Sequence, residues 1–345
     1  MKRNTFILIA IAALAAIALC ACNMDATDGI YSEVASSTES KDVIMISYLG
    51  TYGDELYYLA DDGVYKNGSS TALIANTSSK IIRRASLDES TGNILILLQD
   101  RESLKAQIYE CTAADNYAIG DPINDTNYTG LLANGVFFNE SGIYYSSSAT
   151  EVVSGVSVNY YLETEEYAFF SVLDSDSNYK FYVIKDGAAS ISDVAGDDTK
   201  YVGFQPLSDG STYVLISYDS SKSVFRGYQF TSSGVGDAWF KLNSSIPYAY
   251  ASQAASFCYT QDTSTYMVVK CSNYFDIVDV TDKAATDISV TSLSTGFATD
   301  LRTTEVTNVK KTSTDNVFIV GTYDSLLYQI DLTADDITNS TATQL

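Results

Sequence analysis

The feature that most constrains this chain is a pair of β-prone runs separated by a short polar break, repeated along the sequence. Residues 212–230 show it clearly, because two runs rich in β-branched and aromatic residues flank the polar segment 219–222. This pattern is typical of a β-hairpin. The arrangement recurs at intervals of roughly 40–50 residues, a period typical of propeller blades. The chain is therefore expected to form a series of small antiparallel sheets.

Seven such hairpins can be assigned after residue 43. A further β-prone run precedes each hairpin and a weaker one usually follows, which gives four antiparallel strands per unit, the layout of a β-propeller. The predicted central hairpins span residues 55–66, 93–111, 136–145, 167–184, 212–230, 266–280 and 317–332.

The number of blades and the closure of the ring are not fixed by this pattern. Six or eight blades also fit, because the runs after the third and fourth hairpins are faint. Residues 117–119 are expected to supply an outer strand of the second unit. The last blade could be completed by residues 336–338 or by residues 43–49 from the beginning of the chain.

The composition favours one large all-β domain without convincing helix. The chain has 345 residues, of which 27 are Tyr and only 3 are Pro, and aromatic and β-branched residues suit pleated, half-buried strands. Near-continuous apolar runs such as 94–98 and 318–320 fit blades that are covered on both faces. A pair of β-sandwiches or a β-solenoid is the alternative. The sequence has no WD pair, kelch double glycine or Asp-box, so it indicates no named propeller family.

The N-terminus has the organisation of an export signal. Lys2 and Arg3 precede the uncharged apolar run 5–19, and small residues and cysteines follow at once, as in a secretory signal peptide. Residues 19–22, Leu-Cys-Ala-Cys, resemble the lipobox of bacterial lipoproteins. Cys22 fits the lipidated position better than Cys20, because a bulky leucine directly precedes Cys20. A plain secretory peptide or an uncleaved anchor is the alternative.

This resemblance implies three parts: a lipoprotein signal peptide at residues 1–21, an acylated N-terminus with a flexible Ser/Thr/acidic tether at 22–42, and the propeller domain at 43–345. Acyl chains on Cys22 would anchor the chain to a membrane of the bacterial cell envelope. Asn23 is not the aspartate that retains many such lipoproteins in the inner membrane, which favours the outer membrane.

The charge and the absence of histidine exclude several functions. The formal net charge is −23, so the chain repels phosphate backbones, and nucleic acid is not an expected partner. The sequence contains no His, which excludes Ser-His-Asp and Cys-His catalysis and the usual His-based metal sites. A hydrolase would have to use carboxylates, Lys or Tyr.

Residues 174–178 have the spacing of a calcium loop. Calcium loops of this kind have Gly at the sixth position and a bidentate Glu at the twelfth, whereas this chain has Tyr179 and Lys185 there. A solvated hairpin turn is therefore expected, and no metal or other cofactor is predicted.

Three further groups of residues have both a functional and a structural interpretation. Adjacent acids could serve a carboxylate enzyme, but such pairs in loops are usually solvated. Adjacent tyrosines could form a binding face, but packing between blades also needs them. Cys258 and Cys271 could form a disulfide, although small buried thiols, like Cys111, are favoured. The pairs are Asp61–Asp62, Asp197–Asp198 and Glu165–Glu166, and Tyr57–Tyr58, Tyr144–Tyr145 and Tyr160–Tyr161.

The function expected from these observations is a non-enzymatic binding or scaffold module, anchored to the envelope by its lipid and directed at a protein or other envelope partner. In architecture it resembles the propeller lipoproteins that assist outer-membrane assembly, although no motif carries that role. The alternative is a carboxylate-dependent propeller hydrolase acting on a glycan or an ester, with a divalent metal in the central channel. Convergence of three or more acidic or amide side chains at one mouth of the channel would favour the enzyme.

Overall fold

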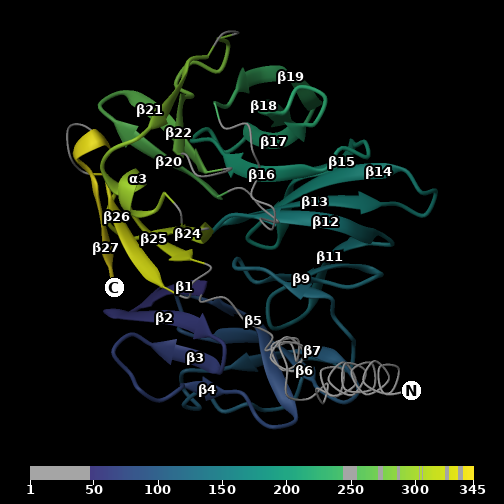
Figure 1. The fold of residues 1–345 in the computed structure, drawn as a ribbon. Helices are drawn as coiled ribbons and strands as arrows, with labels where there is room; N and C mark the ends of the chain where they lie inside the picture. Colours follow the sequence, from purple (N-terminus) through teal and green to yellow (C-terminus); the bar gives the residue numbers. More distant parts are fainter. Residues whose placement is uncertain are drawn as a thin grey trace, which may run out of the picture. The chain divides into compact units, whose positions relative to one another are not determined.

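The fold from Ser47 onward is a ring of small antiparallel sheets. The computed structural model describes residues 47–243, 255–270, 275–285, 288–302, 304, 306–322, 326–332 and 337–345. Within them, consecutive strands form seven sheets, six with four strands and one with three. Figure 1 shows these sheets arranged around a centre, with the last sheet beside the first. The domain is therefore a seven-bladed β-propeller, as predicted.

The first four blades take up the first half of the domain. Blade one contains β1 (Ser47–Tyr52), β2 (Glu55–Ala60), β3 (Gly63–Lys66) and β4 (Ile74–Ala75). Blade two contains β5 (Lys80–Leu87), β6 (Ile94–Asp100) and β7 (Ala106–Cys111). Blade three contains β8 (Gly130–Leu131), β9 (Val136–Phe138), β10 (Gly142–Tyr145) and β11 (Thr150–Ser154). Blade four contains β12 (Ser157–Glu163), β13 (Tyr167–Leu173), β14 (Tyr179–Lys185) and β15 (Ala188–Ala195).

The last three blades follow the same order. Blade five contains β16 (Tyr201–Pro206), β17 (Tyr213–Asp219), β18 (Val224–Thr231) and β19 (Gly234–Lys241). Blade six contains β20 (Ala255–Gln261), β21 (Ser264–Lys270), β22 (Phe275–Asp279) and β23 (Val290–Leu293). Blade seven contains β24 (Val306–Lys311), β25 (Val317–Thr322), β26 (Leu327–Asp331) and β27 (Thr341–Gln344). The helix α3 (Phe297–Asp300) and the 3-10 helix η1 (Ile337–Asn339) lie in connections.

The second strands are apolar on both faces because each blade is covered by a neighbour on either side. All six residues of β25 are buried, and so are the first six of β13. A sheet with one solvated face would alternate instead. This burial explains the near-continuous apolar runs from which the propeller was predicted.

One apolar cluster fills each of the seven junctions between neighbouring blades. The junction of blades four and five is built largely from aromatic rings, with Phe169 in contact with Phe181, Phe204 and Phe230. The smallest cluster closes the ring between blades seven and one. Its buried members are Tyr48, Ile319 and Leu327. We call this junction the seam.

The adjacent tyrosines point to opposite sides of their strands and enter two different junctions. Tyr57 packs between blades one and two, whereas Tyr58 packs at the seam. The other two predicted pairs, in β10 and β12, divide between junctions in the same way. None of the tyrosines in the described ranges is exposed. For these three pairs, packing between blades is therefore the role that the structure supports, rather than a tyrosine-rich binding face.

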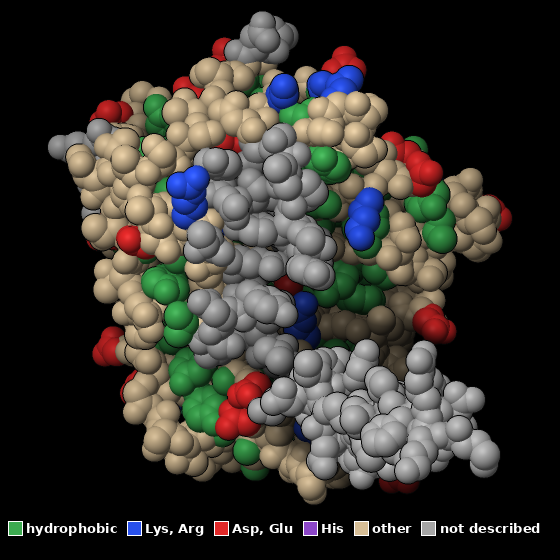
Figure 2. Space-filling view, in the orientation of Figure 1, with side chains coloured by type: hydrophobic (Ala, Val, Ile, Leu, Met, Phe, Trp, Pro, Cys, Tyr) green, Lys and Arg blue, Asp and Glu red, His purple; other side chains and the backbone are tan. Residues whose placement is uncertain are grey.

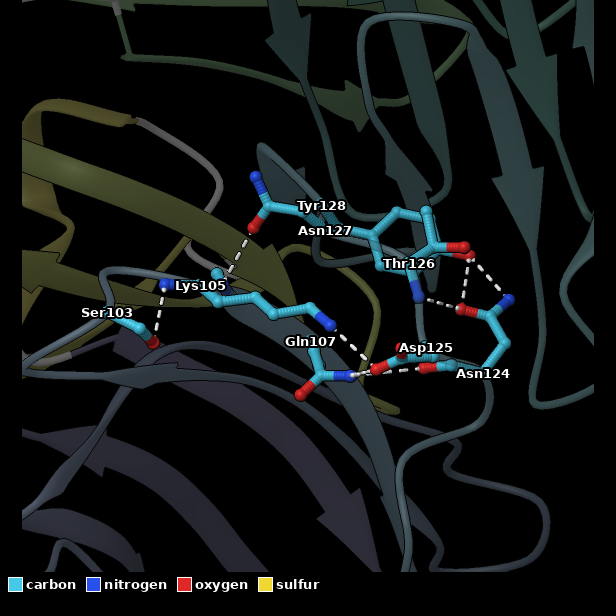
Figure 3. A network of polar contacts seen from close by, with 9 residues as sticks. Ser103, Lys105, Gln107, Asn124, Asp125, Thr126, Asn127 and Tyr128 are labelled. Atoms are coloured by element: carbon cyan, nitrogen blue, oxygen red, sulfur yellow. Dashed lines mark hydrogen bonds and ion pairs between the residues drawn. The ribbon is translucent and has the colours of Figure 1, made fainter.

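The prediction for blade two was wrong at its outer edge. Residues 117–119 form no strand, and the ring of Tyr117 packs into the junction with blade one. The segment after them covers β7 through a single bridge between Tyr109 and Pro122. In Figure 3 the side chains of Lys105 and Gln107 point toward Asp125, and Lys105 lies 2.6 Å from its carboxylate. Two main-chain hydrogen bonds, from Ile123 to Ile108 and from Tyr128 to Ala106, together with these side-chain contacts thus take the place of a fourth strand.

Neither of the two segments predicted to complete blade seven supplies its last strand. Residues 341–344 form the strand β27, which pairs with β26. Residues 337–339 form a 3-10 helix, and Asp336 lies outside the described residues. At the other end, β1 pairs with β2 inside blade one, so the part of 43–49 that is described stays in its own blade. The four-residue helix α3 was not predicted.

Candidate functional site

The central channel is lined by the first strand of each blade. Most neighbouring first strands contact one another around the ring, for example β24 with β1 and β1 with β5. The sheet order is the same in every blade, so all first strands end at the same face of the ring. We call this end of the channel the mouth. Side chains from blades that are far apart in the sequence meet there.

Lys310 is the charged centre of the mouth. Its side chain is 8% exposed, and its Nζ donates to the main-chain oxygen of Leu49 at 2.6 Å. The same ammonium lies 3.2 Å from Oε1 of Glu89, which also accepts from the amide of Thr51 at 2.8 Å. A lysine this buried requires such partners. Blades one, two and seven are therefore joined through one ammonium group.

Glu165 reaches the mouth from the turn after β12. Its Oε2 accepts from the amide of Lys311 at 2.8 Å. Burial raises the pKa of this carboxyl, and the nearby carboxylates of Glu89 and Glu166 raise it further, while Lys310 and the amide bond lower it. Burial also raises the pKa of Tyr48, and Glu89 and Glu165 add to that effect. The mouth therefore holds a carboxyl group that ionises less readily than an ordinary glutamate.

Glu163 begins the same turn and binds two other blades. Its Oε1 lies 3.6 Å from Nη1 of Arg84 in β5. Its Oε2 accepts from the amide of Ala133, just after β8, at 2.9 Å. Glu166 pairs with Lys185 inside blade four and is largely solvated. The four-residue turn thus contacts blades two, three and seven.

The predicted acidic pairs are separated in the structure. Glu165 lies at the mouth, whereas Asp62 is in the exposed turn after β2 and accepts from the Tyr65 hydroxyl at 2.7 Å. Asp197 lies in the connection before β16 and accepts from the amide of Thr199. Among the described residues, no group of three or more Asp, Glu or Cys side chains could hold a metal ion. In the same part of the chain, none of the helices has the length and hydrophobicity to span a bilayer.

The opposite face of the ring carries a repeated type of turn. In blades two to five, the turn between the second and third strands begins with Asp or Asn, whose Oδ1 accepts main-chain amides two and three or four residues ahead. This Asx turn fixes the backbone of the residues that follow. The four acceptors are Asp100, Asn139, Asp174 and Asp219.

The segment that resembled a calcium loop is one of these turns. Oδ1 of Asp174 accepts from the amides of Asp176 and Asn178, each at 2.9 Å. The amide of Asn178 and the other turn donors lower the pKa of Asp174. The carboxylate is therefore engaged by the chain itself, in the geometry expected of a solvated hairpin turn.

The cysteines that the structure describes are free thiols. Cys111 is buried at the junction of blades one and two, and Cys258 is half-buried in β20. Burial raises the pKa of Cys111 to about 11 and that of Cys258 to about 12. Cys271, the other candidate for a disulfide, lies outside the described residues, as does Cys22.

Comparison with known proteins shows the fold but neither a family nor a function. No known family matches the chain, and no curated protein matches it. Among solved structures, KlAtg21 in complex with the coiled coil of AgAtg16 is 11% identical, with a TM-score of 0.53 over 87% of this chain and 98% of that one. A prolyl endopeptidase is 9% identical, with a TM-score of 0.50 over 90% of this chain. This chain spans about half of the endopeptidase, 51%.

Sequence reasoning found Glu165 only as one of several adjacent acids and missed Glu89, Lys310 and the Asx turns. The contact between Glu165 and Lys311 joins residues 146 positions apart, and no local pattern reveals it. A signal for the turns was present, because Asp or Asn ends or directly follows the second strand of four consecutive units. Aligning the hairpins with one another would have revealed that repetition.

Proposed function

We propose that this protein is a lipid-anchored propeller of the bacterial envelope that acts as a non-enzymatic binding or scaffold module for a protein partner. The observation that carries the proposal is the repeated Asx turn, which gives four successive blades exposed turns of fixed shape on one face. Fixed loops lose little conformational entropy on binding, so they suit recognition. Residues 101–104, 175–178 and 220–223 are exposed in three of these turns.

The bonding at the mouth supports the same proposal. Arg84, Lys310 and Glu163 all contact other blades, so these groups hold the ring together.

On the face seen in Figure 2, apolar side chains form small separate patches, and acidic side chains are scattered around the periphery. A polar, acidic surface with rigid turns fits a partner that is recognised through polar contacts.

The proposed membrane location requires a test of its own, because it depends on lipidation of Cys22. Mass spectrometry of the membrane fraction should find a mature N-terminus at acylated Cys22, and Cys22→Ala should release the protein from that fraction. Fractionation of inner and outer membranes should place the wild-type protein in the outer membrane, as Asn23 suggests. A mature N-terminus elsewhere in the chain would contradict the proposed anchor.

Partner binding is tested by affinity purification of the acylated protein from its own envelope. The triple variant Glu102→Gln, Glu140→Gln and Asp176→Asn changes exposed turn residues but keeps every Asx acceptor. We expect it to lose the partner while its melting temperature is unchanged. A control variant with Asp54→Asn, Asp186→Asn and Asp262→Asn alters exposed turns on the face of the mouth. Equal loss in both variants would contradict recognition through the Asx turns.

A carboxylate-dependent hydrolase is the second candidate, and the raised pKa of Glu165 beside Glu89 favours it. Two carboxyl groups in different environments are what acid–base hydrolysis of a glycan requires. Hydrolysis of a panel of glycan and ester substrates, lost in both Glu89→Gln and Glu165→Gln, would support the enzyme. Activity that survives both substitutions would exclude these two residues as catalytic groups.

A further inference from the structure

The turn at residues 163–166 joins blades that are not neighbours. Blades five and six lie between blade four and blade seven on one side of the ring, and blades one to three lie between them on the other. The 2.8 Å hydrogen bond from the amide of Lys311 to Glu165 therefore crosses the channel at its mouth. Glu163 extends the same turn to Arg84 in blade two and Ala133 in blade three.

The strand that Glu165 reaches, β24, is also the strand that forms the seam. Within the described residues, β24 pairs with β25 and β1 pairs with β2, so the two blades meet through side chains. Among the described residues, the seam has the smallest apolar cluster of the seven junctions. Asn308 and Lys310, both in β24, supplement it with hydrogen bonds to the main chain of β1.

We propose that the turn at 163–166 is a lock on the seam: Glu165 holds β24 in place from across the channel, and ionisation of Glu165 loosens this hold. The lock is a conformational device, because the ionisation of Glu165 in blade four determines how readily blade seven separates from blade one. It does not depend on the identity of the partner or on the lipid anchor.

The direction of the pH dependence follows from the groups around Glu165. Lys310 and the amide of Lys311 face it from β24, Glu89 from the turn after β5, Tyr48 from β1, and Glu166 from its own turn. In the closed ring its pKa is raised, mainly by burial and then by the two carboxylates. When the seam opens, water reaches the group and the pKa returns toward its usual value. The closed ring therefore binds the proton more tightly, and a rise in pH favours opening.

Hydrogen exchange on the full chain tests the lock, read at the seam strands β1 and β24 and at the control strand β16. At neutral pH, Glu165→Ala should raise exchange at the seam strands about tenfold, because the amide of Lys311 loses its acceptor across the channel. Glu165→Gln keeps an oxygen acceptor without the charge, so its seam should exchange no faster than that of the wild type. Exchange at β16 should be unchanged in both variants.

The matched control is Glu166→Ala, which removes the adjacent carboxylate and its ion pair inside blade four. We expect wild-type exchange at the seam in this control. After correction for intrinsic rates, the wild-type seam should exchange faster as the pH rises through the pKa of Glu165, and Glu165→Gln should show no such rise. The proposal is overturned if Glu166→Ala opens the seam as much as Glu165→Ala, or if Glu165→Gln keeps the pH dependence. If Glu165→Ala does not fold, the Gln variant and its pH profile still decide the question.

Discussion

Asn308 donates its side-chain amide to the main-chain oxygen of Tyr48 at 3.2 Å, although the two residues are 260 positions apart. This bond lies at the seam, where the first and last blades of the ring meet. Many junctions in the ring depend on broad apolar contact, but the seam combines a small apolar cluster with bonds from β24 to β1. The closure of this propeller therefore combines apolar contact with hydrogen bonds from a few polar side chains.

Lys310→Ala should lower the free energy of unfolding by about 2 kcal/mol, because the oxygen of Leu49 and the half-exposed Glu89 lose their bonds to the ammonium. Chemical denaturation monitored by Trp239 fluorescence measures the change. Lys311→Ala is the control, since Lys311 pairs with Asp315 on the surface and such pairs contribute about 0.5 kcal/mol or less. Equal effects of the two substitutions would show that the buried ammonium does not hold the seam.

Phe169→Ala should be among the most destabilising single substitutions, at about 4 kcal/mol, because it empties the centre of a buried aromatic cluster. Leu104→Ala is the comparison, since Leu104 is 64% exposed and should change the stability by about 0.5 kcal/mol at most. Urea unfolding of the two variants measures both values. A small loss for Phe169→Ala would mean that the neighbouring rings close the cavity.

The strands were predictable because their signal is local. In β17 and β18, apolar and aromatic residues fill two runs on either side of a polar turn, and the pairing of Tyr213 with Phe230 follows directly from that turn. The outer edge of blade two was not predictable in this way. Tyr117 is a residue type that favours strands, but its ring is buried between blades one and two, and the residue forms no strand.

The mouth could not be predicted from the sequence because its partners come from different blades. Glu165 was visible only as one of two adjacent acids, and nothing near it in the sequence distinguishes it from Glu166. The distinction arises from the ring, which buries one carboxyl group at the channel and leaves the other in solvent beside Lys185. Residues whose role depends on ring closure become visible only when the blade order and closure are known.

Asp209→Asn should reduce the loss of stability at acid pH. Burial opposes ionisation of Asp209, but Lys283 of the neighbouring blade and the amides of Ser211 and Thr212 together hold the pKa of the carboxyl well below its usual range. A lowered pKa contributes stability above the unfolded value of about 4, and this is lost as pH falls through the folded value. Melting temperatures across acid pH should show a shallower decline for Asp209→Asn than for the wild type. Asp54→Asn, in an exposed turn, is the control, and an equal decline in both variants would contradict the assignment.

Cys111 and Cys258 should both resist alkylation in the folded protein at neutral pH. Burial raises the pKa of each thiol, to about 11 and about 12 respectively, and the thiolate is the reactive form. In denaturant without a reductant, both should be fully alkylated, because both are free thiols. Peptide mapping by mass spectrometry distinguishes the two positions. Modification of Cys258 in the native protein would contradict the raised pKa of its thiol, whereas protection in denaturant that is removed by a reductant would show that it forms a disulfide.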